Sequence, residues 1–195
     1  MSIDIEKEKN QKKDNFIKNL EYFLEEVNDA INNQDKFDRH SRNSANLSRV
    51  IGESFCRFII LDSDKTDGEK EQKIRDTLSK LIETITRQRS SYIENERERN
   101  ILKDRLNRIL SIGNNDSHDT NYPTNKRDLD EVKSNILFLS DFLLGERLTK
   151  TIEEKFILQN NQEDNKNGIN NIMNTKIKQG IGIIGDNSNI KQIYN

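Results

Sequence analysis

The sequence contains few of the residues on which several classes of protein depend. Its single cysteine, Cys56, excludes a disulfide framework and a cysteine-based zinc site. One proline and 8 glycines in 195 residues offer few helix breaks, and tryptophan is absent. No stretch approaches the ~18 consecutive apolar residues of a membrane-spanning helix, and residues 1–15 hold no apolar run of the signal-peptide type. These absences predict a cytoplasmic protein with no membrane span and no bound metal.

Charged residues are abundant but nearly balanced in sign. The 32 lysines and arginines against 34 aspartates and glutamates give a formal net charge of -2. The charge of the whole chain therefore does not indicate a nucleic-acid or membrane surface. Seven lysines and arginines are concentrated at residues 87–108, interleaved with acidic residues. We interpret this segment as a solvated helix surface with ion pairs, and RNA phosphates are the alternative partner.

Apolar residues recur along the first 158 residues at the three-to-four spacing of amphipathic helices. Five such stripes and a shorter sixth predict helices separated by polar breaks. The predicted fold class is all-α, an antiparallel helical bundle of about five to six helices, because each helix has one side to bury. The stripes occupy residues 16–31, 47–59, 74–85, 101–110, 129–143 and 148–157.

Local signals predict where these helices begin and end. Asp14 is available as the N-terminal cap of the first helix. Leu61–Gly68 is expected to form a loop, because its residues tend to bond their own backbone. The fourth helix is expected to stop at Gly113, followed by a loop over residues 113–127 that holds the only proline. Gly145 is expected to interrupt the last long helix.

The composition changes sharply after the sixth stripe. Residues 159–173 are dominated by asparagine and predict a flexible tether. Residues 174–195 carry isoleucines at even spacing and three glycines, a pattern that disfavours helix. This tail also repeats, since Asn174–Gln179 resembles Asn187–Gln192 thirteen positions later. We interpret the tail as two β-rungs in a β-arch or hairpin, joined by a turn at residues 185–187.

A hairpin of this length is marginal by itself in water, but it gains partners by stacking on copies of itself. Cross-β stacking satisfies each backbone group from the chains above and below. Isoleucines supply a dry face, and asparagine and glutamine form amide ladders. The predicted assembly residues are Ile177, Gln179, Ile181, Ile183, Asn187, Ile190, Gln192 and Ile193.

The tail is similar to the short amyloid-signalling motifs at the ends of bacterial and fungal immune effectors. Residues 190–195, IKQIYN, also resemble the I-Q-I-G core of RHIM motifs. The resemblance implies recruitment through the tail by a protein partner or by a second copy. Two other interpretations stay open: strand addition to a partner's sheet edge, and a small hairpin packed on the bundle. Lys176, Lys178 and Lys191 would stack like charges in a fibre, which favours templated over spontaneous growth.

The run Ser48–Ile60, SRVIGESFCRFII, resembles a helix typical of HEPN-like bacterial proteins, including abortive-infection domains. In those families a later helix ends in a segment like residues 113–118, GNNDSH, and the resemblance covers residues 40–148. Active HEPN ribonucleases carry an arginine shortly before a histidine. That pair cleaves RNA without a metal, normally at the interface of two protomers. The resemblance therefore implies a homodimer of the helical domain and RNA as a partner.

Carried over to this chain, the HEPN resemblance implies His118 as the catalytic histidine and Asn114 as its polar neighbour. Gly113 stands where the arginine is expected. Stabilising a developing phosphorane charge requires a donor such as guanidinium, and Arg108 or Arg105 upstream is the candidate to supply it. The alternative is structural, with Asn114 and His118 bonding backbone groups left free by the helix end.

Two functions follow from these features. The preferred one is a non-enzymatic effector or adaptor in bacterial antiphage or cell-suicide signalling, clustered through residues 174–195. The alternative is a HEPN-type endoribonuclease toxin that uses His118 and a displaced arginine. No cofactor is expected, because the G-x-G-x-x-G pattern at residues 180–185 lacks the helix and βαβ unit of a dinucleotide site. His40 carries no partner pattern and is expected at the surface, whereas Cys56 is expected in the core.

Overall fold

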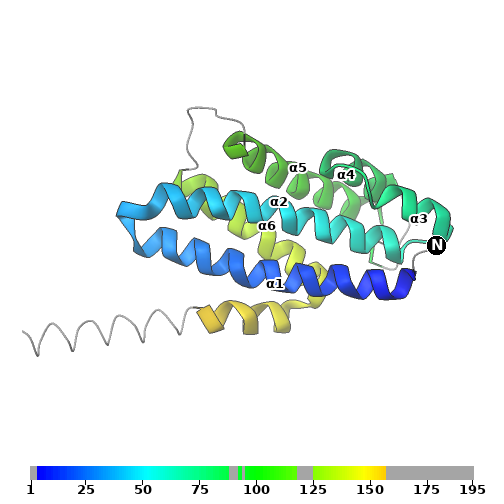
Figure 1. Cartoon of the computed structure of the whole chain (residues 1–195), viewed down its shortest axis with the longest axis horizontal. Coiled ribbons are helices and arrows are strands. Elements are labelled where there is room, and N and C mark those ends of the chain that lie inside the picture. The colour runs from blue at the N-terminus through cyan, green and yellow to red at the C-terminus, as the bar shows by residue number, and fades with distance from the viewer. Residues whose placement is uncertain (1–3, 88–91, 94, 118–124, 157–195) are drawn as a thin grey trace, which may run out of the picture. The chain divides into compact units, whose positions relative to one another are not determined.

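The computed structural model describes residues 4–87, 92–93, 95–117 and 125–156 (Figure 1). Helices account for nearly all of these residues, so the predicted all-α class is confirmed for this part of the chain. The chain divides into two compact units, Met1–Glu153 and Glu154–Asn195. Helices α1 to α6 all belong to the first unit.

The bundle is built around a hairpin of two long helices. Helix α1 (Ile5–Asn32) and helix α2 (Phe37–Asp62) run side by side in opposite directions, joined by the 3-10 turn η1 (Gln34–Lys36) (Figure 1). Phe55 in α2 packs against Phe16 in α1, with ring centroids 6.3 Å apart. The polar break predicted after the first stripe is confirmed, because the turn falls there.

Helix α1 begins earlier than its apolar stripe predicts. Asp4, not Asp14, is the N-cap, and its side chain accepts a hydrogen bond from an amide of the first turn at 3.1 Å. Asp14 lies inside the helix. The added turns are polar and are stabilised by ion pairs at helical spacing, such as Lys12 with Glu8 at 2.6 Å. An apolar pattern cannot reveal such turns.

The segment Leu61–Gly68 was predicted as a loop, and that prediction is wrong at both ends. Helix α2 runs past its first residue, and helix α3 (Asp67–Lys73) begins before its last. The reason is a capping box, in which Glu69 accepts hydrogen bonds from the backbone amide and the hydroxyl of Thr66, at 3.1 and 2.8 Å. The connection between the two helices is therefore confined to residues 63–66.

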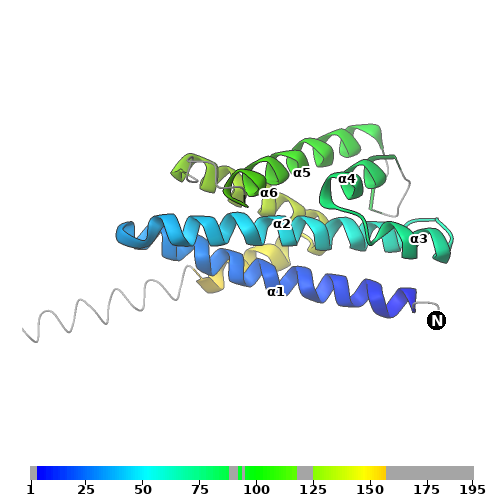
Figure 2. The ribbon, with the colours of Figure 1, turned by 45° about the horizontal axis from the view of Figure 1, so that its top comes forward.

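Helices α4 (Leu78–Arg87) and α5 (Glu96–Ser117) pack on α2 opposite α1, so that α2 lies between them (Figure 1, Figure 2). The sequence pattern predicts that the fourth helix ends at Gly113, but α5 continues to Ser117. A Cβ atom at Gly113 would lie 3.2 Å from the backbone oxygen of Ala45 and 3.3 Å from Cβ of Arg49. Gly113 therefore permits the close approach of α5 to α2 and does not act as a stop signal.

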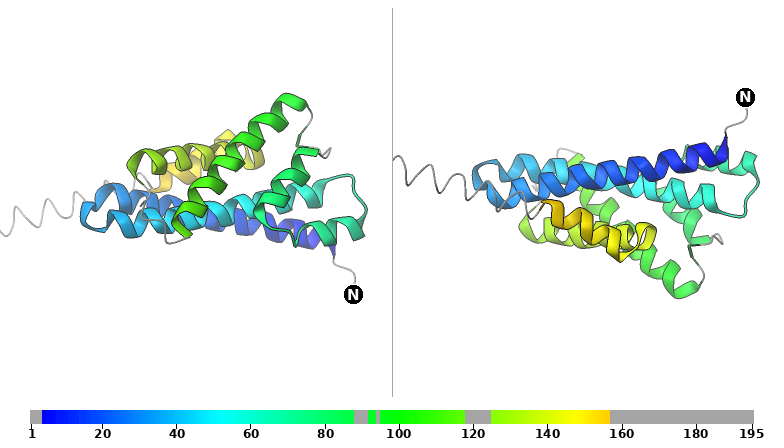
Figure 3. Two further views of the ribbon diagram at one scale, coloured as in Figure 1. Left: turned by 90° about the horizontal axis from the view of Figure 1, so that it is seen from above. Right: turned by 90° about the horizontal axis from the view of Figure 1, so that it is seen from below.

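Helix α6 (Lys126–Leu144) closes the bundle against α2 and α5. Its N-cap, Asn125, accepts a hydrogen bond from the amide of Asp128 at 3.0 Å. The predicted interruption at Gly145 is confirmed, because this residue has a φ of 85° and ends α6. Residues 146–156 are helical again, and their first part folds back along α6 (Figure 3).

Helix α2 supplies the centre of the core. It is buried along most of its length because other helices cover it on several sides. Cys56 is fully buried there, as expected, and burial raises the pKa of its thiol. None of the helices in the described ranges combines the length and apolar character needed to cross a bilayer.

Candidate functional site

The structure places only part of the predicted catalytic set. Asn114 lies in the last turns of α5, and His118 lies outside the described residues. Arg108 lies on α5 at a position that faces α6. The geometry of the set can therefore be judged from Arg108 alone.

Arg108 is already bound to carboxylates of α6. Its Nε and one terminal nitrogen donate to the two carboxylate oxygens of Glu131 at 2.6 and 2.7 Å. Asp128 lies 3.6 Å from the guanidinium. The hydrogen bonds with Glu131 raise the pKa of Arg108, and those with Arg108 lower the pKa of Glu131. A guanidinium held in this bidentate pair would have to leave it to stabilise a phosphorane.

Arg105, the other upstream arginine, also links α5 to α6. It donates to the side-chain oxygen of Asn135 at 2.8 Å, and its guanidinium carbon lies 5.2 Å from the ring centre of Phe138. Asn135 is buried, and its amide nitrogen has no hydrogen-bond partner among the described residues. We therefore assign Arg105 a structural role in fixing the contact between these helices.

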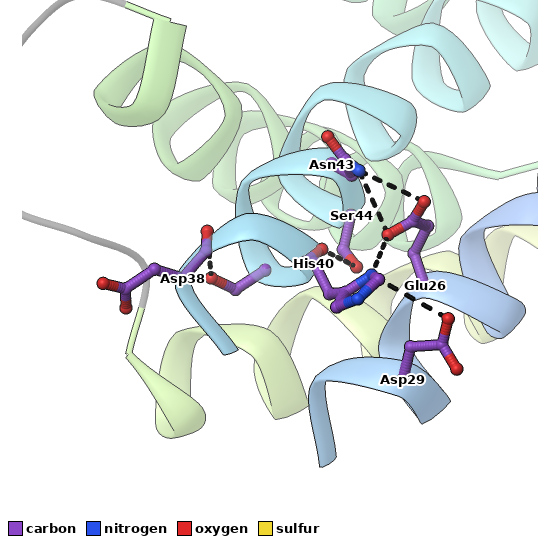
Figure 4. Close-up of polar contacts among 7 residues, drawn as sticks. Glu26, Asp29, Asp38, His40, Asn43 and Ser44 are labelled. Carbon is purple, nitrogen blue, oxygen red and sulfur yellow. Dashed lines mark hydrogen bonds and ion pairs between the residues drawn. The ribbon is translucent and has the colours of Figure 1, made fainter. Parts of the chain in front are cut away.

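A polar cluster that the sequence did not suggest lies between α1 and α2 (Figure 4). His40 was expected at the surface, but its side chain is only 13% exposed. Its Nδ1 lies 2.7 Å from Glu26 and 3.9 Å from Asp29. Asn43 donates to both carboxylate oxygens of Glu26 at 3.2 Å. The expectation was wrong because it considered His40 on its own helix, whereas its partners lie on the neighbouring one.

The topology contains a signal that predicts this pairing. Glu26 and His40 stand seven residues before and seven residues after Asn33, where the hairpin turns. Residues equally far from the turn of an antiparallel pair lie opposite each other. Counting outward from the polar break would therefore have placed the carboxylate beside the imidazole.

Among the described residues, the His40 cluster consists of an oriented imidazole and hydroxyls that bond backbone carbonyls. A carboxylate bonded to one ring nitrogen fixes the orientation of a histidine, as in catalytic acid–base pairs. The nearby hydroxyls are occupied, however: Ser41 donates to the carbonyl of Asp38 at 3.2 Å, and Ser44 donates to that of His40 at 2.8 Å. We therefore interpret the cluster as a polar clasp that holds the hairpin together.

A pocket of about 330 Å³ lies beside this clasp, where the turn of the hairpin meets the start of α6. Its walls mix apolar side chains with two amides, a carboxylate and an ammonium group. Within the described ranges no group of three histidine, cysteine, aspartate or glutamate side chains is arranged to hold a metal ion. The residues that line the pocket are Ala30, Ile31, Gln34, Phe37, Asp38, Asn125 and Lys126.

The predicted assembly residues, from Ile177 to Ile193, all lie outside the described residues. Comparisons of the chain with family models, curated proteins and solved structures found no match.

Proposed function

We propose that this chain is a non-enzymatic effector or adaptor of bacterial antiphage or cell-suicide signalling, with a HEPN-like helical domain. A templating partner or a second copy recruits it through residues 174–195, in the cytoplasm. The observation that carries the proposal is the internal repeat of the tail, where Asn174–Gln179 resembles Asn187–Gln192. Two matched rungs with alternating isoleucines and amide side chains suit cross-β stacking.

The division of the chain supports a separate assembly module. The buried apolar side chains of the described residues run from Phe16 to Ile152, so the helices have a core of their own. The tail lies outside the first unit, Met1–Glu153. A helical domain with its own core is suited to being clustered without refolding.

The ribonuclease alternative has weaker support. Its displaced arginine, Arg108, is neutralised by Glu131 and lies close to Asp128. A paired guanidinium of this kind attracts RNA phosphate less than a free one, because the phosphate must compete with the carboxylates. We therefore retain the non-enzymatic function as the proposal.

Seeded assembly tests the proposal with the full chain and three altered chains. The first altered chain ends at Asn171. Ile190→Lys places a charge on the dry face of the second rung, and Ile169→Lys is the matched control, with the same change in the tether. Thioflavin fluorescence and pelletable protein are followed with and without fragments of preformed tail fibre. We expect seeded fibres with a spacing near ~4.7 Å from the full chain and from I169K only.

A full chain that does not assemble when seeded, or fibres that survive removal of the tail, would contradict the proposal. His118→Ala in the full chain separates the two functions in cells. The proposal expects toxicity to persist in H118A and to disappear when residues 173–195 are deleted. Loss of RNA cleavage in a folded H118A variant would instead support the ribonuclease.

A further inference from the structure

A second pocket, of about 450 Å³, lies where the loop after α2, the end of α3 and one face of α4 meet. It shares no lining residue with the His40 clasp or with the Arg108 pair. Four of its lining side chains are cationic and two are acidic, so its walls carry excess positive charge on a chain of net charge -2. These six are Lys65, Lys73, Lys80, Arg87, Asp76 and Glu83.

Hydrogen bonds hold the backbone segments that carry these cations. Arg57 of α2 donates through Nε to the carbonyl of Ile74 at 2.9 Å, which ties the end of α3 to α2. On the other wall, the Ser63 hydroxyl donates to the carbonyl of Ile60 at 2.7 Å, where the loop after α2 begins. Two of the three segments that line the pocket are therefore held by hydrogen bonds at α2.

The cations of the pocket are only weakly neutralised. Lys73 lies 3.8 Å from Asp76, and Lys65 lies 3.8 Å from the exposed Glu69, both near the limit of an ion pair. Lys80 and Arg87 are exposed, and no side-chain hydrogen bond or ion pair joins them to the rest of the described chain. An anion that enters the pocket therefore meets lysine and arginine side chains that are either unpaired among the described residues or held only by weak ion pairs.

We propose that this pocket binds the phosphate chain of a small polyphosphate ligand. Its volume is in the range of small-molecule sites, and lysine and arginine are the side chains that bind phosphate best. Lys80 and Arg87 stand seven residues apart on α4, about 10 Å along the helix axis. A chain of linked phosphates reaches both of them, whereas a single orthophosphate does not.

The same lining excludes a nucleobase as the principal ligand. Besides the charged side chains, the lining formed by the described residues contains only Thr84, whose hydroxyl already donates to the carbonyl of Lys80 at 2.8 Å. None of the described lining residues is aromatic, so none offers a stacking surface. The phosphate chain is therefore the part that is recognised.

Calorimetric titration of the full chain with tripolyphosphate at low salt tests the proposal. Lys80→Ala combined with Arg87→Ala removes two exposed cations from the pocket. The matched control, Arg97→Ala with Lys103→Ala, removes the same charges from an exposed part of α5. We expect the pocket variant to weaken the Kd about tenfold or more and the control to change it less than about twofold.

Three further ligands sharpen the result. We expect the Kd of ATP to equal that of tripolyphosphate. We expect the Kd of orthophosphate to be higher by about tenfold or more. The proposal is overturned if tripolyphosphate does not bind, or if the control variant loses as much affinity as the pocket variant. It is also overturned if a short RNA binds more tightly than tripolyphosphate, because that result indicates an extended nucleic-acid surface.

Discussion

His40 and Arg108 each have a carboxylate on the helix packed beside them, and this determines what either side chain can do. Glu26 fixes the imidazole at 2.7 Å, and Glu131 occupies the guanidinium through two hydrogen bonds. In both cases the charged group serves as a link between helices. At the scale of the residue, the bundle thus uses these two side chains to hold neighbouring helices together.

The Arg108–Glu131 pair predicts a pH dependence of stability. Because Arg108 holds the pKa of Glu131 below its usual value of 4.5, the pair's contribution is fully present above that value. It is lost as the pH falls through the lower pKa of the folded state. Since both side chains are partly exposed, we expect Glu131→Gln to lower the free energy of unfolding by only about 0.5 kcal/mol near neutral pH.

Urea unfolding of wild type and E131Q at a series of pH values measures this effect. The difference between the two proteins should shrink towards zero as the pH falls below 4.5. Asp130→Asn is the control, because Asp130 is exposed on the same turn of α6. A difference that is unchanged in acid would show that the pair is not its source.

At the scale of the element, caps and glycines determine where helices end and how closely they pack. The Thr66–Glu69 box starts α3 inside a segment whose composition favours a loop. Gly113 lies in the middle of a contact between α5 and α2, although glycine usually ends a helix. Glycine thus ends one helix, at Gly145, and allows another to pack closely on its neighbour, at Gly113.

The close contact predicts opposite effects of the same substitution at two glycines. At Gly113, an added methyl group meets a backbone oxygen at 3.2 Å, so Gly113→Ala should lower the free energy of unfolding by about 1 kcal/mol or more despite the better helix propensity. At Gly68, in the first turn of α3, nothing lies within 4 Å of the added atom. Gly68→Ala should therefore stabilise the protein, by up to about 1 kcal/mol.

Chemical denaturation of both variants under one set of conditions makes the comparison. Gly52→Ala is a useful third variant, because its new atom would lie 3.6 Å or more from its nearest neighbours, at ordinary contact distance. We expect it to behave more like G68A than like G113A. Equal effects at Gly113 and Gly68 would contradict a role for Gly113 in the approach of α5 to α2.

At the scale of the whole molecule, the helical part has the core of an independent domain. Helix α2 is its centre, with α1 on one side and α4 and α5 on the other (Figure 2). Phe55 contacts both Phe16 of α1 and Phe142 of α6, with centroid distances of 6.3 and 6.0 Å. One aromatic side chain thus joins three helices.

A chain that ends at residue 156 should therefore keep the stability of the helical domain. We expect its urea midpoint to equal that of the full chain, because the buried apolar side chains of the described residues end at Ile152. Cys56 offers a second measurement, since it is fully buried. Its thiol should react with a thiol reagent only on unfolding, and at the same rate in both chains. Faster reaction in the shorter chain would show that the tail completes the core.

For the described part of the chain, the sequence by itself determined the helical class and most of the residues that enter the core. Four residues of the predicted stripes, Ile31, Val50, Ile101 and Leu148, are exposed instead. The class and the core follow from periodicity, because a stripe of apolar residues must be buried wherever the helix packs. Most residues of the stripe 129–143, for example, are buried on α6 as their spacing predicts. The end of α6 at Gly145 also depends on a local property, the backbone conformation of one glycine, and so it too was predictable.

Only the tertiary structure decided which polar side chains meet. The Glu26–His40 contact, the Arg108–Glu131 pair and the cationic pocket at α3 and α4 join residues far apart in the chain or on different elements. Their formation depends on which helix lies beside which and at what rotation, and helix periodicity does not contain that information. The reason is physical. Burial depends on the apolar face of a single helix, whereas a hydrogen bond or ion pair between helices depends on the relative positions of two side chains.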